Sequence, residues 1–159
     1  RGLDAFGLVW TGWLFSQAWW REELWRTDAP AGTTFDDVLN QYRHNFIPGA
    51  DANDLILQMR TWEKHDVGTT PGLGGDLRRA LGGIHVPVLY MPCATDLYFP
   101  LEDAQVEAAL IPGVTFKPIP SLWGHTAGAA SNPADARFLN TELSAFLTAH
   151  PATGVTSTR

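Results

Sequence analysis

The sequence contains little of what metal and disulfide chemistry requires. Its 159 residues include one cysteine, Cys93, which excludes an intrachain disulfide and a cysteine-rich zinc site. The five histidines do not occur at the i, i+4 spacing of a metal-binding helix. We therefore expect no structural metal and no bound cofactor.

Basic residues and long apolar runs are also scarce. Eleven Lys and Arg stand against 17 Asp and Glu, for a net charge of -6, and the scattered cations argue against nucleic acid as a partner. The uncharged stretch 5–20 includes Thr11, Ser16 and Gln17 and falls short of the roughly 20 apolar residues of a membrane span. No signal-peptide pattern is visible, so the expected location is cytoplasmic, away from the membrane.

The composition that remains is that of a globular domain, with 45% apolar and 18% charged residues. Tryptophan is the exception, because seven occur and five of them lie in the first 25 positions. These five are Trp10, Trp13, Trp19, Trp20 and Trp25. The cluster predicts a large apolar surface near the N-terminus.

The first 66 residues have helical periodicity throughout. The pattern predicts a helix over 6–26 that is interrupted near Gly12, and a second helix over 34–46. A third helix is expected to begin at Asp51, a favourable N-cap, and to place Leu55, Ile56, Met59 and Trp62 on one face.

The pattern changes after residue 66. A glycine-rich hinge with a short helix is expected over 67–82, and residues 83–150 follow as strand 86–91, helix 101–110, strand 115–119 and helix 133–150. The apolar run 86–91 is typical of a parallel strand buried on both faces. The order predicts an α/β fold of parallel strands flanked by helices, which lacks the neighbouring strands that a stable sheet needs. Residues 151–159 are expected to form a disordered tail.

Two residues with catalytic chemistry follow the two expected strands. Asp96 comes after the first strand and His125 after the second, so both lie where ligands bind in parallel sheets. A carboxylate beside an imidazole orients the ring and stabilises its protonated form. The arrangement matches the acid and base of a Ser-Asp-His triad, with the serine upstream of this chain, because no serine here lies in G-x-S-x-G.

Several motifs together carry a resemblance to a known family. They are GWLFSQA at 12–18 with RE at 21–22, DAND at 51–54, TDLYFP at 95–100 and IPSLWGH at 119–125. With them, residues 2–148 resemble the homoserine O-acetyltransferase-like group of α/β-hydrolase-fold proteins. The resemblance implies that the chain is the C-terminal part of an α/β-hydrolase fold, that residues 1–66 form a helical lid, and that Asp96 and His125 are catalytic.

The resemblance also implies a reaction and its partners. Members pass an acyl group from acetyl-CoA or another acyl-CoA to the serine and then to a hydroxyl acceptor, or to water in hydrolytic relatives. The partners would be these small molecules and the N-terminal half of the same fold, and a homodimer is left open. The candidate substrate-pocket residues are Trp13, Tyr98, Phe99, Trp123 and Thr126.

Two features keep other functions open. Homoserine acetyltransferases resemble one another in having Asp directly after the catalytic His, whereas this chain has Thr126. An esterase of the same fold is therefore an alternative to an acyltransferase. Because the nucleophile is absent, we expect the chain alone to be inactive, and a non-catalytic interaction module is a further alternative. Cys93 ends a predicted strand and is expected to be a core residue.

Overall fold

A computed structural model describes residues 2–27, 29–45 and 49–151 of the chain. The described residues up to Gly82 contain only helical elements: α1 (Gly2–Leu14), α2 (Gln17–Arg21), η1 (Leu24–Arg26), α3 (Phe35–Asn45), α4 (Ala52–Lys64), η2 (Val67–Thr69) and α5 (Leu77–Gly82). The remainder alternates strands with helices: β1 (Leu89–Tyr90), α6 (Leu101–Ala108), β2 (Thr115–Phe116), η3 (Gly124–Ala129) and α7 (Pro133–Ala149). The expected change from helices to strand, helix, strand, helix is therefore observed.

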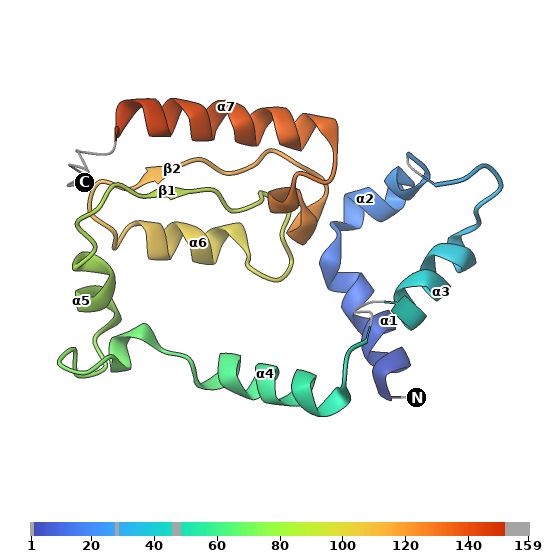
Figure 1. Ribbon diagram of the computed structural model, residues 1–159, viewed down its shortest axis with the longest axis horizontal. Coiled ribbons are helices and arrows are strands. Elements are labelled where there is room, and N and C mark those ends of the chain that lie inside the picture. Colours follow the sequence, from blue (N-terminus) through green and yellow to red (C-terminus); the bar gives the residue numbers. More distant parts are fainter. Residues whose placement is uncertain (1, 28, 46–48, 152–159) are drawn as a thin grey trace, which may run out of the picture.

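The second half forms three layers. β1 and β2 pair in parallel, with Leu89 opposite Thr115 and Tyr90 opposite Phe116. A further parallel bridge joins Cys93 to Ile119. In Figure 1, α7 covers one face of this pair and α6 the other. Both strand exits therefore point toward the lid helices α1 and α2.

The strands are shorter than the sequence predicts. The apolar run 86–91 is strand only at Leu89–Tyr90, and 115–119 is strand only at Thr115–Phe116. The expectation that the first strand is buried on both faces is wrong, because Val86 is 67% exposed. Within the described residues the sheet has two strands, so each strand has one unpaired edge and little to cover its ends.

The N-terminal helix is interrupted at a different place from the one predicted. Gly12 lies inside α1, and the break falls at Phe15 and Ser16. Ser16 is the N-cap of α2, with an extended backbone (φ -65°, ψ 156°), and its hydroxyl accepts a hydrogen bond from the Trp19 backbone amide. The serine ends the first helix because its side chain can satisfy a free amide of the next one.

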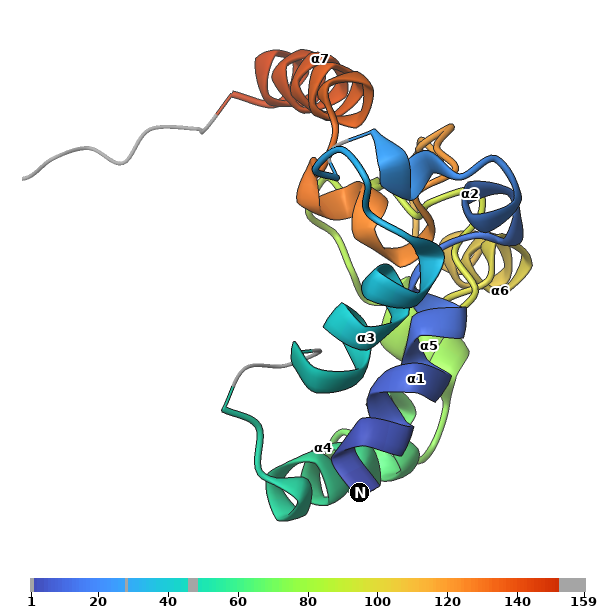
Figure 2. The same cartoon turned by 90° about the vertical axis from the view of Figure 1, so that its right-hand side faces the viewer.

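The other lid helices lie close to their predicted bounds. The helix expected over 34–46 is α3, and residue 46 lies outside the described residues. α1 and α3 pack side by side, which Figure 2 shows from a second direction. Asp51 caps α4 as predicted, by accepting from the Asn53 amide. The apolar face of α4 is largely exposed rather than covered, and part of it forms a groove with the start of α1.

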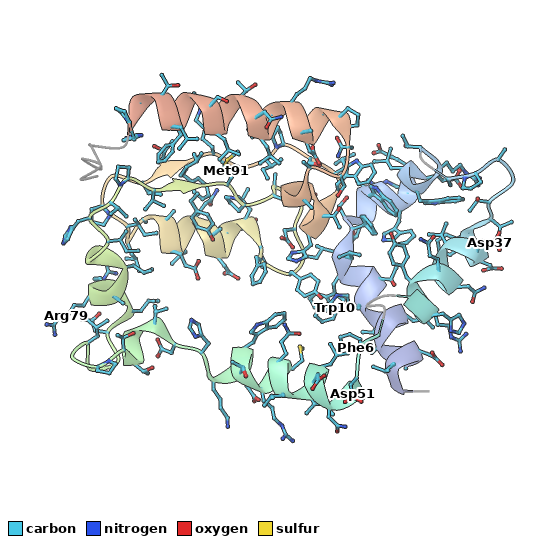
Figure 3. The ribbon with its side chains drawn as sticks, viewed as in Figure 1. Phe6, Trp10, Asp37, Asp51, Arg79 and Met91 are labelled. Carbon is cyan, nitrogen blue, oxygen red and sulfur yellow. The ribbon has the colours of Figure 1, made fainter. Side chains whose placement is uncertain are left out.

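The core consists of two clusters joined by one tryptophan. Phe15, Trp19, Trp25 and Val38 form the buried cluster of the lid segment. The second cluster lies between the strands and α7, where Met91 packs, as Figure 3 shows. The buried members of this second cluster are Cys93, Ile119 and Ala127. Trp123 packs against both clusters, so it connects the lid to the sheet.

The closing helix α7 begins at the predicted residue, but part of its apolar face is not buried. Phe138 and Leu139 pack against the second cluster, whereas Leu143 is exposed and Leu147 is 65% exposed. The apolar face of α7 is therefore not fully covered in the last two turns of the helix. The two short strands beneath α7 provide too little surface to cover its full length. Residues 152–159 of the expected tail lie outside the described residues.

Candidate active site

The structure brings Asp96 and His125 into hydrogen-bond contact. Asp96 follows the exit of β1, and His125 lies in η3, after the exit of β2. The Nδ1 atom of His125 is 3.1 Å from Oδ2 of Asp96. The Asp96 side chain is 9% exposed, and the His125 side chain is 38% exposed. The carboxylate is thus enclosed, and the ring is open to a reactant.

The turn that follows Asp96 fixes its carboxylate. Oδ1 accepts hydrogen bonds from the backbone amides of Tyr98, at 2.7 Å, and Phe99, at 3.2 Å. An Asp side chain that bonds to the amide two residues later is a common turn device, because it replaces a backbone acceptor. One carboxylate oxygen is held by the turn, and Oδ2 is left to meet the imidazole.

This contact determines which ring nitrogen of His125 can act as a base. An ionised carboxylate only accepts hydrogen bonds. Nδ1 of the neutral ring therefore carries the proton and donates a hydrogen bond to Asp96. The lone pair then lies on Nε2. An imidazole in this state can take a proton from a nucleophile, and the adjacent carboxylate stabilises the cation that forms.

The junction between α1 and α2 supports the His125 loop. Gly124 has φ +56°, and a Cβ atom there would lie 2.8 Å from the Leu14 carbonyl oxygen and 2.9 Å from the Ser16 amide nitrogen. Only glycine allows two backbones to approach so closely in this conformation. Nearby, the Ser16 hydroxyl donates to the Leu122 carbonyl at 2.6 Å. The backbone of residues 14–16 is therefore in direct contact with the loop that carries His125.

Two aromatic rings lie against His125. The ring centroid of Tyr98 is 4.6 Å from that of His125, and the centroid of Phe99 is 5.6 Å away. Tyr98 also contacts two lid tryptophans, with centroid separations of 4.4 Å to Trp10 and 6.5 Å to Trp13. Three of the candidate pocket residues thus lie near the dyad of Asp96 and His125. They are Trp13, Tyr98 and Phe99.

The environment of Tyr98 changes its acidity. Burial, and then the negative charge of Asp96, raise the pKa of the phenol far above its ordinary value. Both effects favour the neutral phenol over the phenolate. Its oxygen is buried and has no hydrogen-bond partner among the described residues.

The other two candidate pocket residues have structural contacts. The Trp123 ring lies 6.4 Å from Phe15 and 5.9 Å from Trp19, between centroids. The Thr126 hydroxyl donates to the Trp123 carbonyl at 2.8 Å. Trp123 packs in the core and Thr126 closes a turn, and a role for either in substrate binding stays a prediction.

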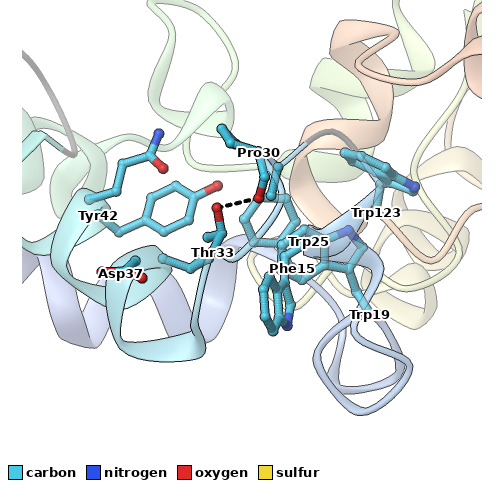
Figure 4. A pocket seen from close by; sticks show the side chains of 11 residues that line it. Phe15, Trp19, Trp25, Pro30, Thr33, Asp37, Tyr42 and Trp123 are labelled. Atoms are coloured by element: carbon cyan, nitrogen blue, oxygen red, sulfur yellow. Dashed lines mark hydrogen bonds between the residues drawn. The ribbon is translucent and has the colours of Figure 1, made fainter.

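Trp19 and Trp25 of the tryptophan cluster line a pocket that does not include Asp96 or His125. Figure 4 shows this cavity of about 480 Å³, and neither Asp96 nor His125 lines it. Its aromatic lining consists of Phe15, Trp19, Trp25, Tyr42 and Trp123. Phe15, Trp19 and Trp25 are core residues, whereas the rings in contact with His125 are Tyr98 and Phe99 of the Asp96 turn.

A nucleophile for His125 is not found in the described part of the chain. Within residues 2–27, 29–45 and 49–151, the His125 ring is hydrogen-bonded to Asp96 and to no serine hydroxyl. Three serine hydroxyls donate elsewhere: Ser16 to Leu122, Ser121 to Asp135 and Ser131 to Thr126. Ser157 lies outside the described residues. Cys93 is buried, as expected of a core residue.

Sequence reasoning missed one group of polar residues beside the site. Ser121, Asp135 and Asn132 are linked by side-chain hydrogen bonds near the start of α7. The available signal was the pattern Asn132, Pro133, Asp135, which combines an N-cap, a proline at the first position and an acid in the first turn.

The chain is similar in sequence to known ester hydrolases. No protein-family model matches the chain. It is 32% identical over 124 residues to a probable esterase of Corynebacterium glutamicum, a match that covers 78% of this chain and 34% of that protein. It is 28% identical over 127 residues to an ethyl acetate hydrolase of Pseudomonas veronii, with the same coverage of 78% and 34%. The chain spans about a third of the length of the curated relatives it matches.

Solved structures agree with these relatives. The acetyl esterase MekB superposes with a TM-score of 0.80 at 26% identity, over 92% of this chain and 41% of that chain. An acetylester hydrolase from Corynebacterium glutamicum gives a TM-score of 0.78 at 28% identity, over 91% and 41%. The chain therefore has part of an α/β-hydrolase-type fold, and its similar proteins are esterases.

These results refine the expectations from the sequence. They support the esterase alternative better than acyl transfer from coenzyme A, and they do not support the homoserine O-acetyltransferase-like group in particular. No helix in the described residues has both the length and the apolar character needed to cross a bilayer.

Proposed function

We propose that this chain supplies the acid and the base of a carboxylic ester hydrolase that acts on short-chain acyl esters. The observation that carries the proposal is the 3.1 Å contact between Nδ1 of His125 and Oδ2 of Asp96 at the exits of two parallel strands. The esterase relatives support the reaction class. The serine belongs to a segment of the full-length protein upstream of this chain.

The reaction follows from the orientation of the ring. Nε2 of His125 takes the proton of the serine hydroxyl as its oxygen attacks the ester carbonyl, and Asp96 stabilises the imidazolium. The imidazolium then gives its proton to the departing alcohol, which leaves an acyl-serine. Water attacks this intermediate while His125 again accepts a proton, and the imidazolium returns that proton to the serine oxygen as the carboxylic acid is released.

The surroundings of the base favour a small, neutral acyl group. Phe99 and Tyr98 lie against the His125 ring, and Trp13 extends the same aromatic surface. Apolar rings bind the alkyl part of an ester. The names of two relatives, an ethyl acetate hydrolase and an acetyl esterase, describe substrates of this kind.

Replacing the dyad residues in the full-length protein tests the proposal. With 4-nitrophenyl acetate as substrate, His125→Ala and Asp96→Asn should each lower kcat by about 10⁴-fold, because removal of a triad member has effects of this size. His65→Ala is the matched control, since His65 is an exposed histidine at the end of α4. Turnover that survives His125→Ala would refute the proposal.

Acyl transfer to a hydroxyl acceptor is the second candidate, favoured by the motif resemblance of residues 2–148. The two reactions share the acyl-serine and differ in what attacks it. Incubation of the full-length protein with acetyl-CoA and a panel of amino-acid and simple alcohols separates them. We expect free acetate whatever the acceptor, and an O-acetylated product formed in preference to acetate would favour the transferase.

The interaction-module alternative makes a separate prediction. A module without a nucleophile would not react with a serine-directed fluorophosphonate, whereas the full-length hydrolase should be labelled. Labelling of the full-length protein that His125→Ala abolishes would exclude the module. The 159-residue chain alone should not be labelled at any described serine.

A further inference from the structure

Two buried polar side chains lie outside the dyad and have no part in the proposed reaction. Ser121 is 6% exposed and Asp135 is 5% exposed. A buried carboxylate is unfavourable unless hydrogen bonds compensate for its lost hydration. Oδ2 of Asp135 accepts from the Ser121 hydroxyl at 2.7 Å and from the Asn132 amide nitrogen at 2.5 Å.

The start of α7 holds Asp135 in place. Asn132 is the N-cap, and its Oδ1 accepts from the backbone amides of Ala134 and Asp135. Asp135 lies in the first turn of the helix, where the helix dipole favours a negative charge. Asp135 is therefore an anchor of fixed position, and the Ser121 hydroxyl is bound to it.

Ser121 links this anchor to both loops of the dyad. Its hydroxyl oxygen accepts from the Trp123 backbone amide at 3.1 Å, two residues before His125. Its carbonyl accepts from the Thr95 hydroxyl at 2.7 Å, one residue before Asp96. One residue thus ties the loop of the acid, the loop of the base and the start of α7 together.

The dyad needs such support because its own bond is weak. His125 is more than a third exposed, and a polar contact that is open to solvent contributes little to holding two side chains together. A catalytic geometry must be held to within about 0.5 Å, which requires a rigid backbone beneath the side chains. Loss of the Ser121 hydroxyl would leave the Trp123 amide without its acceptor and Asp135 with one donor fewer.

We infer that Ser121, Asp135 and Thr95 are positioning residues. They hold the His125 and Asp96 loops in the relative position at which Nδ1 of His125 meets the Asp96 carboxylate. They act through the backbone of the two loops and touch neither the substrate nor the reacting atoms. The inference rests on the proposed function for its kinetic effect, whereas its effect on the ring of His125 is measurable without turnover.

The test compares variants of the full-length protein. Ser121→Ala removes the central hydroxyl, and Thr95→Val removes a donor while keeping the shape of the side chain. Thr95→Ser is the conservative variant that keeps the donor. Asp76→Ala is the matched control for lost stability, because Asp76 also caps a helix, α5, at the opposite end of the strands from the dyad (Figure 1).

Two readouts separate positioning from stability. At a temperature where circular dichroism shows every variant to be folded, Ser121→Ala and Thr95→Val should lower kcat by about 10- to 100-fold with KM within about threefold, since an ångström of misplacement can have this effect. Thr95→Ser and Asp76→Ala should stay within about threefold of the unchanged protein. In ¹⁵N spectra of labelled histidine, the first two variants should lose the Nδ1-protonated tautomer of His125.

The outcomes that overturn the inference are distinct from those that overturn the function. Unchanged kcat and an unchanged His125 tautomer in Ser121→Ala and Thr95→Val would refute positioning while leaving the esterase proposal intact. An equal loss in Asp76→Ala would also refute it, because general destabilisation would then explain the effect. If turnover survives His125→Ala, the function is wrong, and the ¹⁵N tautomer alone decides whether these residues position the ring.

Discussion

Gly124→Ala tests whether the lid holds the loop of the base. Gly124 precedes His125 and has φ +56°, a conformation that costs an L-residue roughly 1–2 kcal/mol. The added Cβ would also lie 2.8 to 3.0 Å from three backbone atoms of residues 14–16. These atoms belong to the junction of α1 and α2, so the two segments must separate to admit the methyl group.

The expected loss of stability is the sum of two effects. Ala130, at φ +56°, shows that the chain accepts an alanine in this backbone conformation, so the close approach at Gly124 is the decisive difference. Forcing a methyl group into a packed contact costs about 1–3 kcal/mol. Together with the backbone strain, the substitution should destabilise the fold by about 2–5 kcal/mol, a large share of the 5–15 kcal/mol of a typical domain.

Thermal and urea unfolding measure this effect. A chain of this size loses about 2–4 °C of Tm per kcal/mol, so Tm should fall by roughly 4–20 °C. The matched control is Gly128→Ala in the same element, η3, where a Cβ atom would meet nothing within 4 Å. If Gly124→Ala proves as stable as Gly128→Ala, the close contact between lid and loop is not present in solution.

Three further predictions concern single side chains. Ser16→Ala removes a donor to Leu122 and the acceptor of the Trp19 amide, so it should destabilise the fold by about 1–3 kcal/mol in urea unfolding, and an unchanged midpoint would contradict this. The neutral phenol of Tyr98 is favoured in the fold, because burial and then the nearby carboxylate raise its pKa. The raised pKa of Tyr98 contributes fully to the stability of the fold below the ordinary phenol pKa of about 10, and this contribution is lost as the pH rises above that value. The Tyr98→Phe variant should therefore lose less stability than the unchanged protein between about pH 9 and pH 11. Cys93 is buried and should react with a thiol reagent only as the chain unfolds, whereas rapid labelling of the native protein would contradict its place in the core.

The order of elements could be predicted because its signals are local. Asp51 accepts a hydrogen bond from the amide of Asn53, two residues later, and the helix begins where the sequence predicts. The helix with Pro133 in its first turn likewise begins as expected. A cap is a contact within one turn of the chain, so neighbouring residues suffice to identify it.

The errors arose where distant residues decide the outcome. The N-terminal helix breaks at Ser16 rather than Gly12, and the Ser16 hydroxyl bonds to Leu122, 106 residues further along the chain. The predicted strand 86–91 is mostly not strand, because strand length depends on which neighbours pair with it. Leu147 follows the apolar periodicity of α7 and is nevertheless exposed, since periodicity identifies a face but not what covers it.

The amino-acid sequence by itself determined that Asp96 and His125 follow successive parallel strands, and that a helical segment precedes them. Parallel strands place their exits at one edge of a sheet, so the two side chains had to be near each other. Only the tertiary structure shows the 3.1 Å contact, together with the close approach of residues 14–16 to Gly124 and the bond of Ser121 to Asp135 beside it. Such contacts join residues far apart in the chain, and no local pattern specifies their distance.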